Sequence, residues 1–389
     1  MIFETPELRD NERDVLRLIA DLRDRLQDRV AEPRRWAGTL RRMAFARAVQ
    51  GSNSIEGYNA SLDDVVAAVE GEPTLDATEE TQLALAGYRD AMTYVLQIAG
   101  DDALEVDEGL LKGLHFMMIK HDLRKNPGQW RPGSIYVRRE NGERVYEGPP
   151  SEDVSGLIAE MLDSLKRDES PVLVRAAMAH LNLVLVHPFS DGNGRMARCL
   201  QTLVLARDRV LVPTFSSIEE FLGRNTQAYY DILAEVGAGS WHPERDARPW
   251  IRFCLRAHYS QIRTMLRRRE EIEQIWNACV ALAESHGLPE RCAAALMDAS
   301  YGLRLRRGSY RASAKSVTGE EISEQTASRD LRAMVDRRLL APLGERRARY
   351  YLAGIEPVEL HEQVRANRPS QTTNDPFVVA RERRQLSLA

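Results

Sequence analysis

The sequence predicts a mainly helical protein, and three observations lead to this fold class. Apolar residues mostly recur every three or four positions along the 389-residue chain, which is the period of an amphipathic helix. Aromatic residues, which favour strands, make up only 6% of the chain. Alternating apolar and polar residues are confined to short segments. We therefore expect a helical core that carries a β-hairpin, followed by a smaller C-terminal domain.

The composition is that of an ordinary soluble globular protein. The net charge is −4, 43% of the residues are hydrophobic and 29% are charged, and the length suffices for two or three domains. No apolar run approaches the length of a membrane span, and the first residues lack the basic region and apolar core of a secretory signal. We therefore expect a cytoplasmic protein without membrane contact.

The four cysteines are Cys199, Cys254, Cys279 and Cys292. All of them lie in apolar segments with helical spacing, and none forms a C-x-x-C pair. Reduced, buried thiols are therefore expected rather than a zinc site or disulfide bonds.

Several helices are expected in the N-terminal part of the chain. Val15, Leu18 and Leu22 fit one apolar stripe of the first helix. Ser61 is followed by two aspartates and is expected to cap a helix that begins there. Apart from that helix, the apolar spacing predicts helices over residues 11–30, 38–50, 75–99 and 106–118.

A β-hairpin is expected between residues 134 and 147. Residues 134–138 alternate in polarity, Asn141-Gly142 is typical of a tight hairpin turn, and residues 144–147 form the returning strand. A loop that contains glycine and proline precedes this segment. From the residues alone, the hairpin is either a surface decoration or a functional edge.

The residues from His187 to Arg198 are the most informative stretch of the chain. The preceding helix ends at His187, because Pro188 lacks a backbone donor and restricts the residue before it. The tight turn over residues 191–194 follows, and helical spacing then resumes as far as about residue 207. A glycine-rich turn that leads into a helix N-terminus presents bare N–H groups and a positive dipole end, which together bind anions.

The side chains of this stretch suit chemistry on phosphate groups. His187 is expected to accept a proton near neutral pH, which is the usual range of histidine. Asp191 is a hard oxygen ligand for Mg²⁺. Arg195 and Arg198 lie three positions apart on one helix face, where they can bind phosphate oxygens. These residue types indicate phosphoryl or nucleotidyl transfer, in which positioning and charge neutralisation provide most of the catalysis.

The stretch resembles the signature of the Fic family, H-x-F-x-[D/E]-G-N-G-R-x-x-R, at every specified position. The resemblance runs from the N-terminal helices to about residue 260 and implies a Fic-type helical core. It also implies an enzyme that uses ATP and Mg²⁺ to transfer AMP to a Ser, Thr or Tyr hydroxyl of a target protein and of itself. His187 would then be the catalytic base and Asp191 the metal ligand. The nucleotide phosphates would contact Gly192, Asn193, Gly194, Arg195 and Arg198.

Ser52 and Glu56 allow two interpretations. From the residues alone, a helix end is followed by a capping turn, and Glu56 is a surface acid. The segment also resembles the [S/T]-x-x-x-E-[G/N] inhibitory motif of many Fic proteins, in which the glutamate pairs with the second motif arginine, here Arg198. An acid in the γ-phosphate position beside that arginine mispositions ATP.

The resemblance leaves other reactions open. Some members of the family transfer phosphate or phosphocholine instead of AMP. Others remove AMP from a modified protein and use the inhibitory glutamate to orient water, so removal of AMP by Glu56 and His187 is an alternative.

The resemblance also gives the hairpin a role. In the Fic fold the hairpin at this place, called the flap, pairs its edge with the target segment that carries the hydroxyl. Residues 134–147 would do so here, and Val137 and Arg138 would face the nucleotide.

Three further residues of the expected core have alternative roles. Tyr229 and Tyr230 lie on an expected helix over residues 216–235. From the residues alone they are core residues, whereas the resemblance implies that one of them contacts the nucleotide. His180 lies among alanines and leucines, so it is expected to be packed and hydrogen-bonded rather than a ligand.

A second domain is expected after a long helix over residues 249–285. A short helix, a turn, a second helix that begins with T-A-S-R-D-L and two short strands around a basic loop resemble a winged helix-turn-helix domain. Its arginines could bind DNA phosphates, although acids dilute the positive face and such modules also dock proteins. A DNA-binding regulator that senses nucleotide is therefore a hypothesis of a different class. The candidate phosphate contacts are Arg329, Arg332, Arg346, Arg347 and Arg349.

Four regions are expected in all. They are an N-terminal helical region with the inhibitory helix (1–100), a Fic catalytic core (101–286), a winged helix-turn-helix domain (287–355) and a flexible tail (356–389). The tail is expected because its residues show no apolar period. DNA would bind over residues 288–355. Relatives of this layout often dimerise, so a homodimer is expected.

Overall fold

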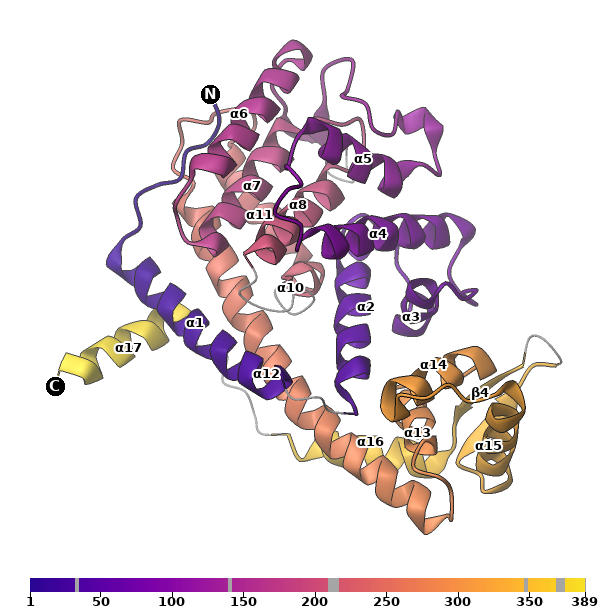
Figure 1. Cartoon of the computed structure of the whole chain (residues 1–389). Helices are drawn as coiled ribbons and strands as arrows, with labels where there is room; N and C mark the ends of the chain where they lie inside the picture. The colour runs from indigo at the N-terminus through magenta and orange to yellow at the C-terminus, as the bar shows by residue number, and fades with distance from the viewer. Residues whose placement is uncertain (32–34, 139–141, 209–216, 346–348, 369–374, 389) are drawn as a thin grey trace.

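The computed structural model describes residues 1–31, 35–138, 142–208, 217–345, 349–368 and 375–388 (Figure 1). Helices account for most of these residues, as predicted, and the sheets of the described part are two short antiparallel hairpins. Within the same ranges, no helix combines the length and the apolar character that crossing a membrane requires.

The N-terminal helices begin close to where the sequence predicts them. Ser61 Oγ accepts a hydrogen bond from the Asp64 backbone N–H at 3.1 Å, which confirms the predicted start of the third helix. The helices are α1 (Asp10–Ala31), α2 (Ala37–Ile55), α3 (Leu62–Glu70), α4 (Glu79–Ile98) and α5 (Glu108–Ile119).

The second helix is longer than predicted. The residues predicted as a turn continue α2 as far as Ile55, and Glu56 caps its end. The physical reason is local, because Asn53 Nδ2 donates to Val49 O at 2.8 Å and Ser54 Oγ donates to Gly51 O at 3.0 Å. These polar side chains bond to carbonyls of their own helix instead of ending it. Ser52 is therefore a helical residue.

A bundle of helices forms the centre of the molecule. Every residue of α7 except Arg175 is buried, since the helix is apolar on nearly all sides. It packs against α8, so the two helices on either side of the His187 loop form the innermost layer. The helices of this part are α6 (Val154–Arg167), α7 (Val172–Val186), α8 (Asn193–Arg207), α10 (Glu219–Arg224), α11 (Thr226–Gly237) and α12 (Arg248–Ser285).

The single helix predicted over residues 216–235 is wrong in one respect, because the chain breaks at Asn225 between α10 and α11. Asn225 Nδ2 donates to Phe221 O at 2.8 Å and Thr226 Oγ1 donates to Gly223 O at 3.0 Å, so side chains replace backbone donors there. Beside this break, α10 crosses α2 closely: a Cβ on Gly223 would lie 2.6 Å from Gly51 Cα. Only glycines allow this approach, which fixes α2 against the core.

The predicted hairpin is present as β1 (Tyr136–Arg138) and β2 (Arg144–Glu147), with Val137 opposite Tyr146. Asn141 lies outside the described residues. Tyr146 is buried, and its hydroxyl donates to Leu185 O at 2.8 Å. The hairpin is therefore attached to α7 two residues before His187.

The long helix α12 connects the central bundle with the C-terminal domain (Figure 1). That domain contains α13 (Cys292–Ser300), α14 (Arg307–Thr318), α15 (Glu324–Asp336), β3 (Leu340–Leu343) and β4 (Tyr350–Ala353). The predicted order of helices followed by two strands is present, and β3 pairs with β4 in antiparallel register.

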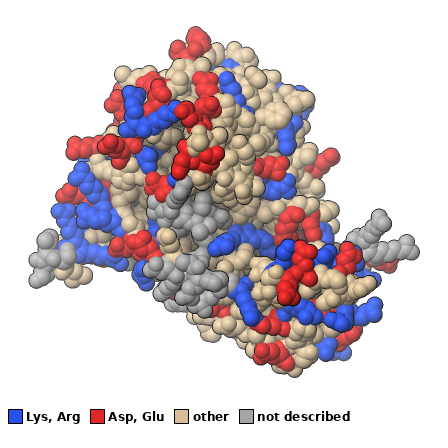
Figure 2. Space-filling model, viewed as in Figure 1, with Lys and Arg blue, Asp and Glu red and all other residues tan. Residues whose placement is uncertain are grey.

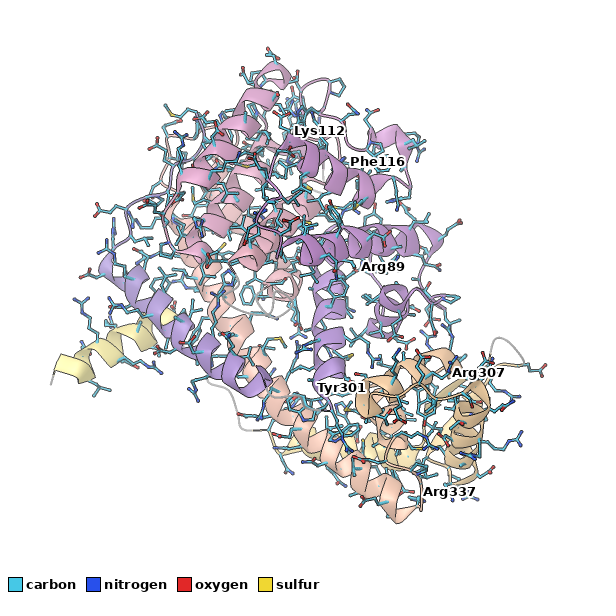
Figure 3. The ribbon with its side chains drawn as sticks, in the orientation of Figure 1. Arg89, Lys112, Phe116, Tyr301, Arg307 and Arg337 are labelled. Atoms are coloured by element: carbon cyan, nitrogen blue, oxygen red, sulfur yellow. The ribbon has the colours of Figure 1, made fainter. Side chains whose placement is uncertain are left out.

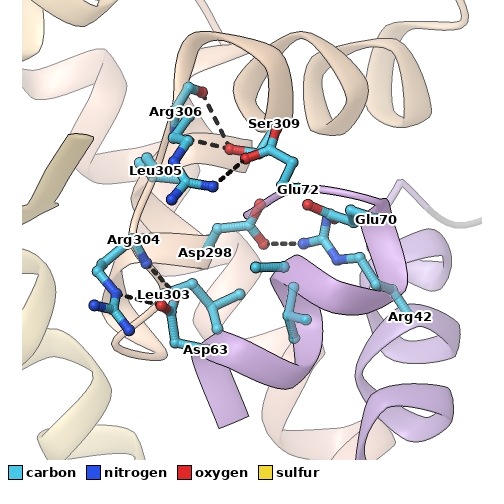
Figure 4. Close-up of a pocket in the computed structure, with 12 residues that line it drawn as sticks. Arg42, Asp63, Glu70, Glu72, Asp298, Leu303, Arg304, Leu305, Arg306 and Ser309 are labelled. Atoms are coloured by element: carbon cyan, nitrogen blue, oxygen red, sulfur yellow. Dashed lines mark hydrogen bonds and ion pairs between the residues drawn. The ribbon is translucent and has the colours of Figure 1, made fainter. Parts of the chain in front are cut away.

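The C-terminal domain is attached to the N-terminal helices through ion pairs (Figure 4). Arg42 of α2 binds Asp298 of α13, and it also binds Glu70 at 3.1 Å. Arg304, which follows α13, binds Asp63 of α3. These contacts bring α2 and α3 against a domain that follows much later in the chain, with sequence separations of 256 and 241 residues.

The prediction of a flexible tail from residue 356 is wrong for most of that segment. It forms α16 (Ile355–Ala366) and α17 (Pro376–Leu388). α16 packs against α12 and α13, and α17 packs against α1. The ring of Phe377 lies 4.9 Å from each of the guanidinium carbons of Arg252 and Arg256. Contacts with distant helices therefore order a segment whose own apolar pattern is weak.

Candidate active site

His187 lies at the end of α7 in a left-handed backbone conformation, with φ 53°. Its Nδ1–H donates to Val184 O at 3.0 Å, because a carbonyl oxygen can only accept. This bond places the proton on Nδ1 and leaves Nε2 as the proton acceptor in the neutral ring. Burial lowers the pKa of His187, although the Val184 carbonyl and the charge of Glu56 oppose the effect. A lowered pKa keeps the base form populated at neutral pH.

Arg131 supports the turn that carries His187, a role that the sequence did not indicate. Its Nε donates to His187 O at 2.8 Å and its Nη1 donates to Gly133 O at 2.6 Å. Its Nη2 donates to Pro149 O, at the other end of the hairpin. The buried guanidinium therefore connects the turn at His187 to both ends of the hairpin.

Asn193 closes the loop between the two central helices. Its Oδ1 accepts from the Phe189 backbone N–H at 2.9 Å, and its Nδ2 donates to Phe189 O at 2.8 Å. Both polar atoms of the side chain thus bond to the Phe189 backbone within the loop. The backbone N–H of Asn193 is a separate donor that can bind an anion. Asn193, Gly194 and Arg195 begin α8, so their backbone N–H groups have no intrahelical acceptor.

His115 of α5 is a second support of this loop, and sequence reasoning missed it. Its Nε2–H donates to Asp191 O at 2.9 Å, and its Nδ1 accepts from the Gly128 backbone N–H at 2.8 Å. The imidazole stacks on Phe189 with ring centroids 3.7 Å apart. Burial lowers the pKa of His115 to about 4, so the ring stays neutral with this tautomer. No motif marks this histidine, because its partners are backbone atoms of two distant loops.

Arg195 and Arg198 are both buried, with 1% of each exposed. Nε and Nη1 of Arg195 have no hydrogen-bond partner among the described residues. Its guanidinium carbon lies 5.1 Å from the ring centroid of Tyr58, and its Nη2 lies 4.0 Å from Asp191 Oδ2. A buried guanidinium with unused donors is a strong site for a phosphate group.

Arg198 is occupied by residues of α2. Its Nη2 donates to Glu56 Oε1 at 2.7 Å and to Ser52 O at 2.9 Å, and its Nε donates to Ser52 Oγ at 2.7 Å. A Cβ on Gly194 would lie 2.5 Å from Glu56 Oε1, so this carboxylate lies directly over the first turn of α8. The pair that the resemblance implied is therefore present in the structure.

Asp191 contacts a lysine rather than a metal ligand set. Its Oδ2 lies 2.6 Å from Lys125 Nζ, and its Oδ1 accepts from the Gly192 N–H at 2.7 Å. Burial alone would raise the pKa of this carboxyl, but Lys125 and Arg195 outweigh burial and hold the pKa below its usual range. Within the described residues, no group of three His, Cys, Asp or Glu side chains could hold a metal ion. A single carboxylate nevertheless suits Mg²⁺ that is bound mainly by phosphates and water.

The two tyrosines of α11 have different surroundings. Tyr229 is 1% exposed, and its hydroxyl bonds to His180 Nε2 at 2.9 Å, so it packs in the core, and its contact with a nucleotide stays a prediction. His180 also bonds to Gln201 Oε1 at 2.6 Å, as expected for a packed histidine. Tyr230 is 45% exposed, and its hydroxyl donates to Ile55 O at 2.9 Å, next to Glu56. Tyr230 therefore remains a candidate contact.

The hairpin residues Val137 and Arg138 lie on β1. Val137 is partly buried against the core, whereas Arg138 is exposed and donates from Nη1 to Gly142 O at 2.9 Å. Their expected contacts with a nucleotide stay a prediction.

The segment that contains this site matches a known family profile. Residues 105–205 match the profile of the Fic/DOC family. The chain carries a Fic domain. The match includes α5 with His115, the hairpin, and the His187 loop with α8, so it contains most of the residues described above.

Two curated relatives support this assignment. The protein adenylyltransferase Fic of Nematostella vectensis is 28% identical over 221 residues, which cover 55% of this chain and 47% of that protein. The protein adenylyltransferase fic-1 of Caenorhabditis elegans is 29% identical over 265 residues, which cover 64% of this chain and 46% of that protein. The chain thus spans less than half the length of these relatives.

Solved structures confirm the Fic-type helical fold. A Fic family protein from Desulfovibrio desulfuricans G20 has a TM-score of 0.57 and 22% identity, and the match covers 90% of this chain and 97% of that one. Fic-1 from C. elegans has a TM-score of 0.52 and 26% identity, and the match covers 66% and 72% of the two chains.

The structure describes only some of the basic residues that were predicted to contact DNA in the C-terminal domain. Arg346 and Arg347 lie outside the described residues, whereas Arg329, Arg332 and Arg349 are exposed. Figure 2 shows acidic and basic side chains interspersed over the visible face of the molecule, including this domain. DNA binding by this domain stays a prediction.

Proposed function

We propose that this protein transfers AMP from ATP to a hydroxyl group of a protein. The observation that carries the proposal is the state of His187, whose Nδ1 is bonded to Val184 O and whose Nε2 is left to accept a proton. The relatives named protein adenylyltransferase support the same reaction class. The buried, unused donors of Arg195 and the N-terminus of α8 supply the anion site that a triphosphate requires.

The proposed reaction is an in-line displacement. The hydroxyl oxygen attacks the α-phosphorus of ATP, the bond from that phosphorus to the β-bridging oxygen breaks, and pyrophosphate leaves. Nε2 of His187 takes the hydroxyl proton as the new bond forms. Backbone N–H groups of Gly192, Asn193 and Gly194 and the guanidinium of Arg195 stabilise charge on the phosphate oxygens.

Mg²⁺ would be held by Asp191 together with phosphate oxygens, and it would neutralise charge on the phosphates. Lys125 now occupies Oδ2 of Asp191, so the ammonium would have to move from that oxygen for the metal to bind there. Lys125 is then free to contact a phosphate group.

Glu56 restrains the reaction in this proposal. Nε and Nη2 of Arg198 are engaged by Ser52 and Glu56, and Nη1 is the donor that has no hydrogen-bond partner among the described residues. A γ-phosphate would therefore compete with the Glu56 carboxylate for the same guanidinium. ATP that cannot pair with Arg198 lies in the wrong pose for attack on the α-phosphorus.

The target segment would add to the edge of the flap hairpin, residues 134–147. Main-chain bonds would hold its hydroxyl close to His187, and Val137 and Arg138 would contact the nucleotide. Such pairing depends little on the side chains of the target, so several proteins and the enzyme itself are candidate substrates.

The test uses α-³²P-ATP with the wild-type protein, His187→Ala and Glu56→Gly. His187→Ala is expected to abolish label transfer to protein, and Glu56→Gly is expected to increase it. Equal labelling by all three proteins would contradict the proposed mechanism. Arg245→Ala, an exposed change outside the motif, serves as the control and should label like wild type.

Removal of AMP is a second candidate, because Glu56 lies over the first turn of α8, next to the loop of His187, and its charge partly offsets the lowering of the His187 pKa by burial. The carboxylate would then orient water toward an AMP-modified hydroxyl. Incubation of wild type with a pre-modified target separates the two directions: release of AMP supports removal, and stable label supports transfer alone.

Two further expected partners of the protein, DNA and a second copy of the chain, need separate tests. DNA binding over residues 288–355 predicts a salt-dependent gel shift of the full chain with duplex DNA. A homodimer predicts twice the chain mass of 44.1 kDa by light scattering. Neither result would alter the assignment of His187.

A further inference from the structure

A cavity of about 790 Å³ lies between α2, α12, α13 and α16, and none of the residues from 187 to 198 lines it. Tyr301, at the end of α13, belongs to its wall and lies near the lower end of α2 in Figure 3. The volume falls within the range of about 300–1,000 Å³ that is usual for small-molecule sites. The cavity is therefore large enough for a ligand and separate from the Fic motif.

The lining of this cavity is rich in arginine. Like charges that converge on one space repel each other, unless a counter-ion or acidic side chains offset them. The described lining includes two acids, Glu271 and Glu362. The six arginines of the lining are Arg47, Arg224, Arg267, Arg268, Arg365 and Arg368.

Nearby acids pair with four of these arginines. Glu220 lies 2.6 Å from both Arg224 Nη2 and Arg268 Nη1. Glu271 lies 2.7 Å from Arg368 Nε and 3.4 Å from Arg267 Nε. Each acid is thus shared by two guanidiniums, so the cavity keeps an excess of positive charge.

Arg47 and Arg365 are the remaining two, and neither forms an ion pair with a described residue. Burial and the charges of Arg268 and Arg224 lower the pKa of Arg47 to about 10, although Glu220 opposes them. Arg365 is exposed at the edge of the cavity on α16. The two arginines come from different helices of the lining, Arg47 from α2 and Arg365 from α16.

We propose that this cavity binds a small ligand that carries two or more phosphate groups. Planar guanidinium groups donate paired hydrogen bonds to phosphate oxygens, and several of them around one cavity suit a polyphosphate better than a single carboxylate. Ser300 and Tyr301 provide neutral hydroxyl groups in the same wall. Inorganic polyphosphate and a nucleoside polyphosphate share this chemistry.

Occupancy of the cavity would bear on the regulation of the Fic site. Arg47 lies on α2, the helix whose end carries Ser52 and Glu56. A phosphate bound to Arg47 would attach this helix to α16 through the ligand. The binding proposal itself does not depend on AMP transfer.

The experiment is isothermal titration calorimetry of the full chain with inorganic tripolyphosphate. Arg47→Gln is expected to weaken one binding event by about tenfold or more, which corresponds to the loss of about one charge-assisted contact. Arg41→Gln removes an exposed arginine of the same helix that does not line the cavity, and it should bind like wild type. Arg195→Gln in the Fic motif should leave this event unchanged and thus separates it from binding at the active site.

A second variant covers the case in which Arg47→Gln does not fold. Arg365→Gln changes an exposed side chain, so it should preserve the melting temperature and still weaken the same event. The same titration with a nucleoside triphosphate identifies the kind of ligand. Tighter binding than tripolyphosphate indicates a nucleotide, and equal binding indicates that the site recognises the phosphate chain alone. Wild-type affinity in both Arg47→Gln and Arg365→Gln, or loss of binding only in Arg195→Gln, would overturn the proposal.

Discussion

Glu56 Oε1 accepts a hydrogen bond from Arg198 Nη2 at 2.7 Å, across a sequence separation of 142 residues. The acid ends α2, and the arginine belongs to the second turn of α8. Arg198 is 1% exposed and also donates to Ser52, so the carboxylate supplies the counter-charge of a buried cation whose Nη1 has no hydrogen-bond partner among the described residues. A buried cation that loses its partner is unfavourable, so the carboxylate can leave Arg198 only as a phosphate takes its place.

A graded substitution tests whether charge or bulk is the restraint. Glu56→Gln keeps the shape of the side chain but removes its charge, so a γ-phosphate should displace it more easily. We expect label transfer from ATP to lie between the wild-type level and the level of Glu56→Gly. Initial rates of labelling at saturating ATP provide the measurement. A Glu56→Gln rate equal to wild type would show that charge pairing with Arg198 is not the restraint.

The ammonium of Lys125 and a metal ion would compete for Asp191 Oδ2, because the present distance is 2.6 Å. Lys125→Met removes the competing cation and should lower the Mg²⁺ concentration that gives half-maximal label transfer. Lys120→Met changes an exposed lysine that pairs with Asp90, and it serves as the matched control. An unchanged or higher Mg²⁺ requirement in Lys125→Met would contradict this competition.

His115 holds the motif loop through its two ring nitrogens, although it takes no part in the proposed chemistry. His115→Phe keeps the stacking on Phe189 but leaves the Gly128 N–H and the Asp191 carbonyl without these partners. Loss of these two hydrogen bonds, one buried and one partly buried, should lower the free energy of unfolding by about 2–4 kcal/mol. Transfer should fall as well, because the first turn of α8 is less well positioned. Chemical denaturation and labelling together test this, and wild-type values in both would exclude the positioning role.

Glu219 should make stability depend on pH. The side chain is 1% exposed and accepts from Thr202 Oγ1 at 3.0 Å, and burial raises its pKa to about 7 although Tyr88, Arg198 and Thr202 oppose this. The native state then binds a proton that the unfolded chain has lost, so the free energy of unfolding falls as pH rises from about 4.5 to 7.

Glu219→Gln removes this titration but keeps an oxygen for Thr202. Relative to wild type, the variant should gain roughly 1–3 kcal/mol of stability between pH 5 and pH 8. Glu235→Gln, an exposed change on α11, should show no such gain. Buried histidines with a lowered pKa make the free energy of unfolding rise with pH, but wild type and both variants contain the same histidines, so this effect cancels in the comparison. If wild type and Glu219→Gln differ in free energy of unfolding by the same amount at pH 5 and at pH 8, Glu219 does not titrate with a raised pKa.

The helices of the central bundle could be predicted, because residues that are buried in them recur along the sequence with helical spacing. The ends of α2 and α10 were not, because polar side chains there bond to carbonyls of the helix or break it according to their surroundings. The tail was not predictable either: α17 is ordered by Phe377 between two arginines of α12, a contact that no local pattern records.

The sequence by itself determined the chemistry of the site: the histidine, the aspartate, the glycine turn and the arginines follow one another within twelve positions, and a turn that leads into a helix brings such neighbours together. Only the tertiary structure decided which residues complete it. Lys125, His115 and Arg131 come from other elements, and Tyr229 is buried with its hydroxyl bonded to His180. The reason is physical: hydrogen bonds to backbone atoms and ion pairs between distant segments depend on packing in three dimensions, for which a single sequence carries no periodic signal.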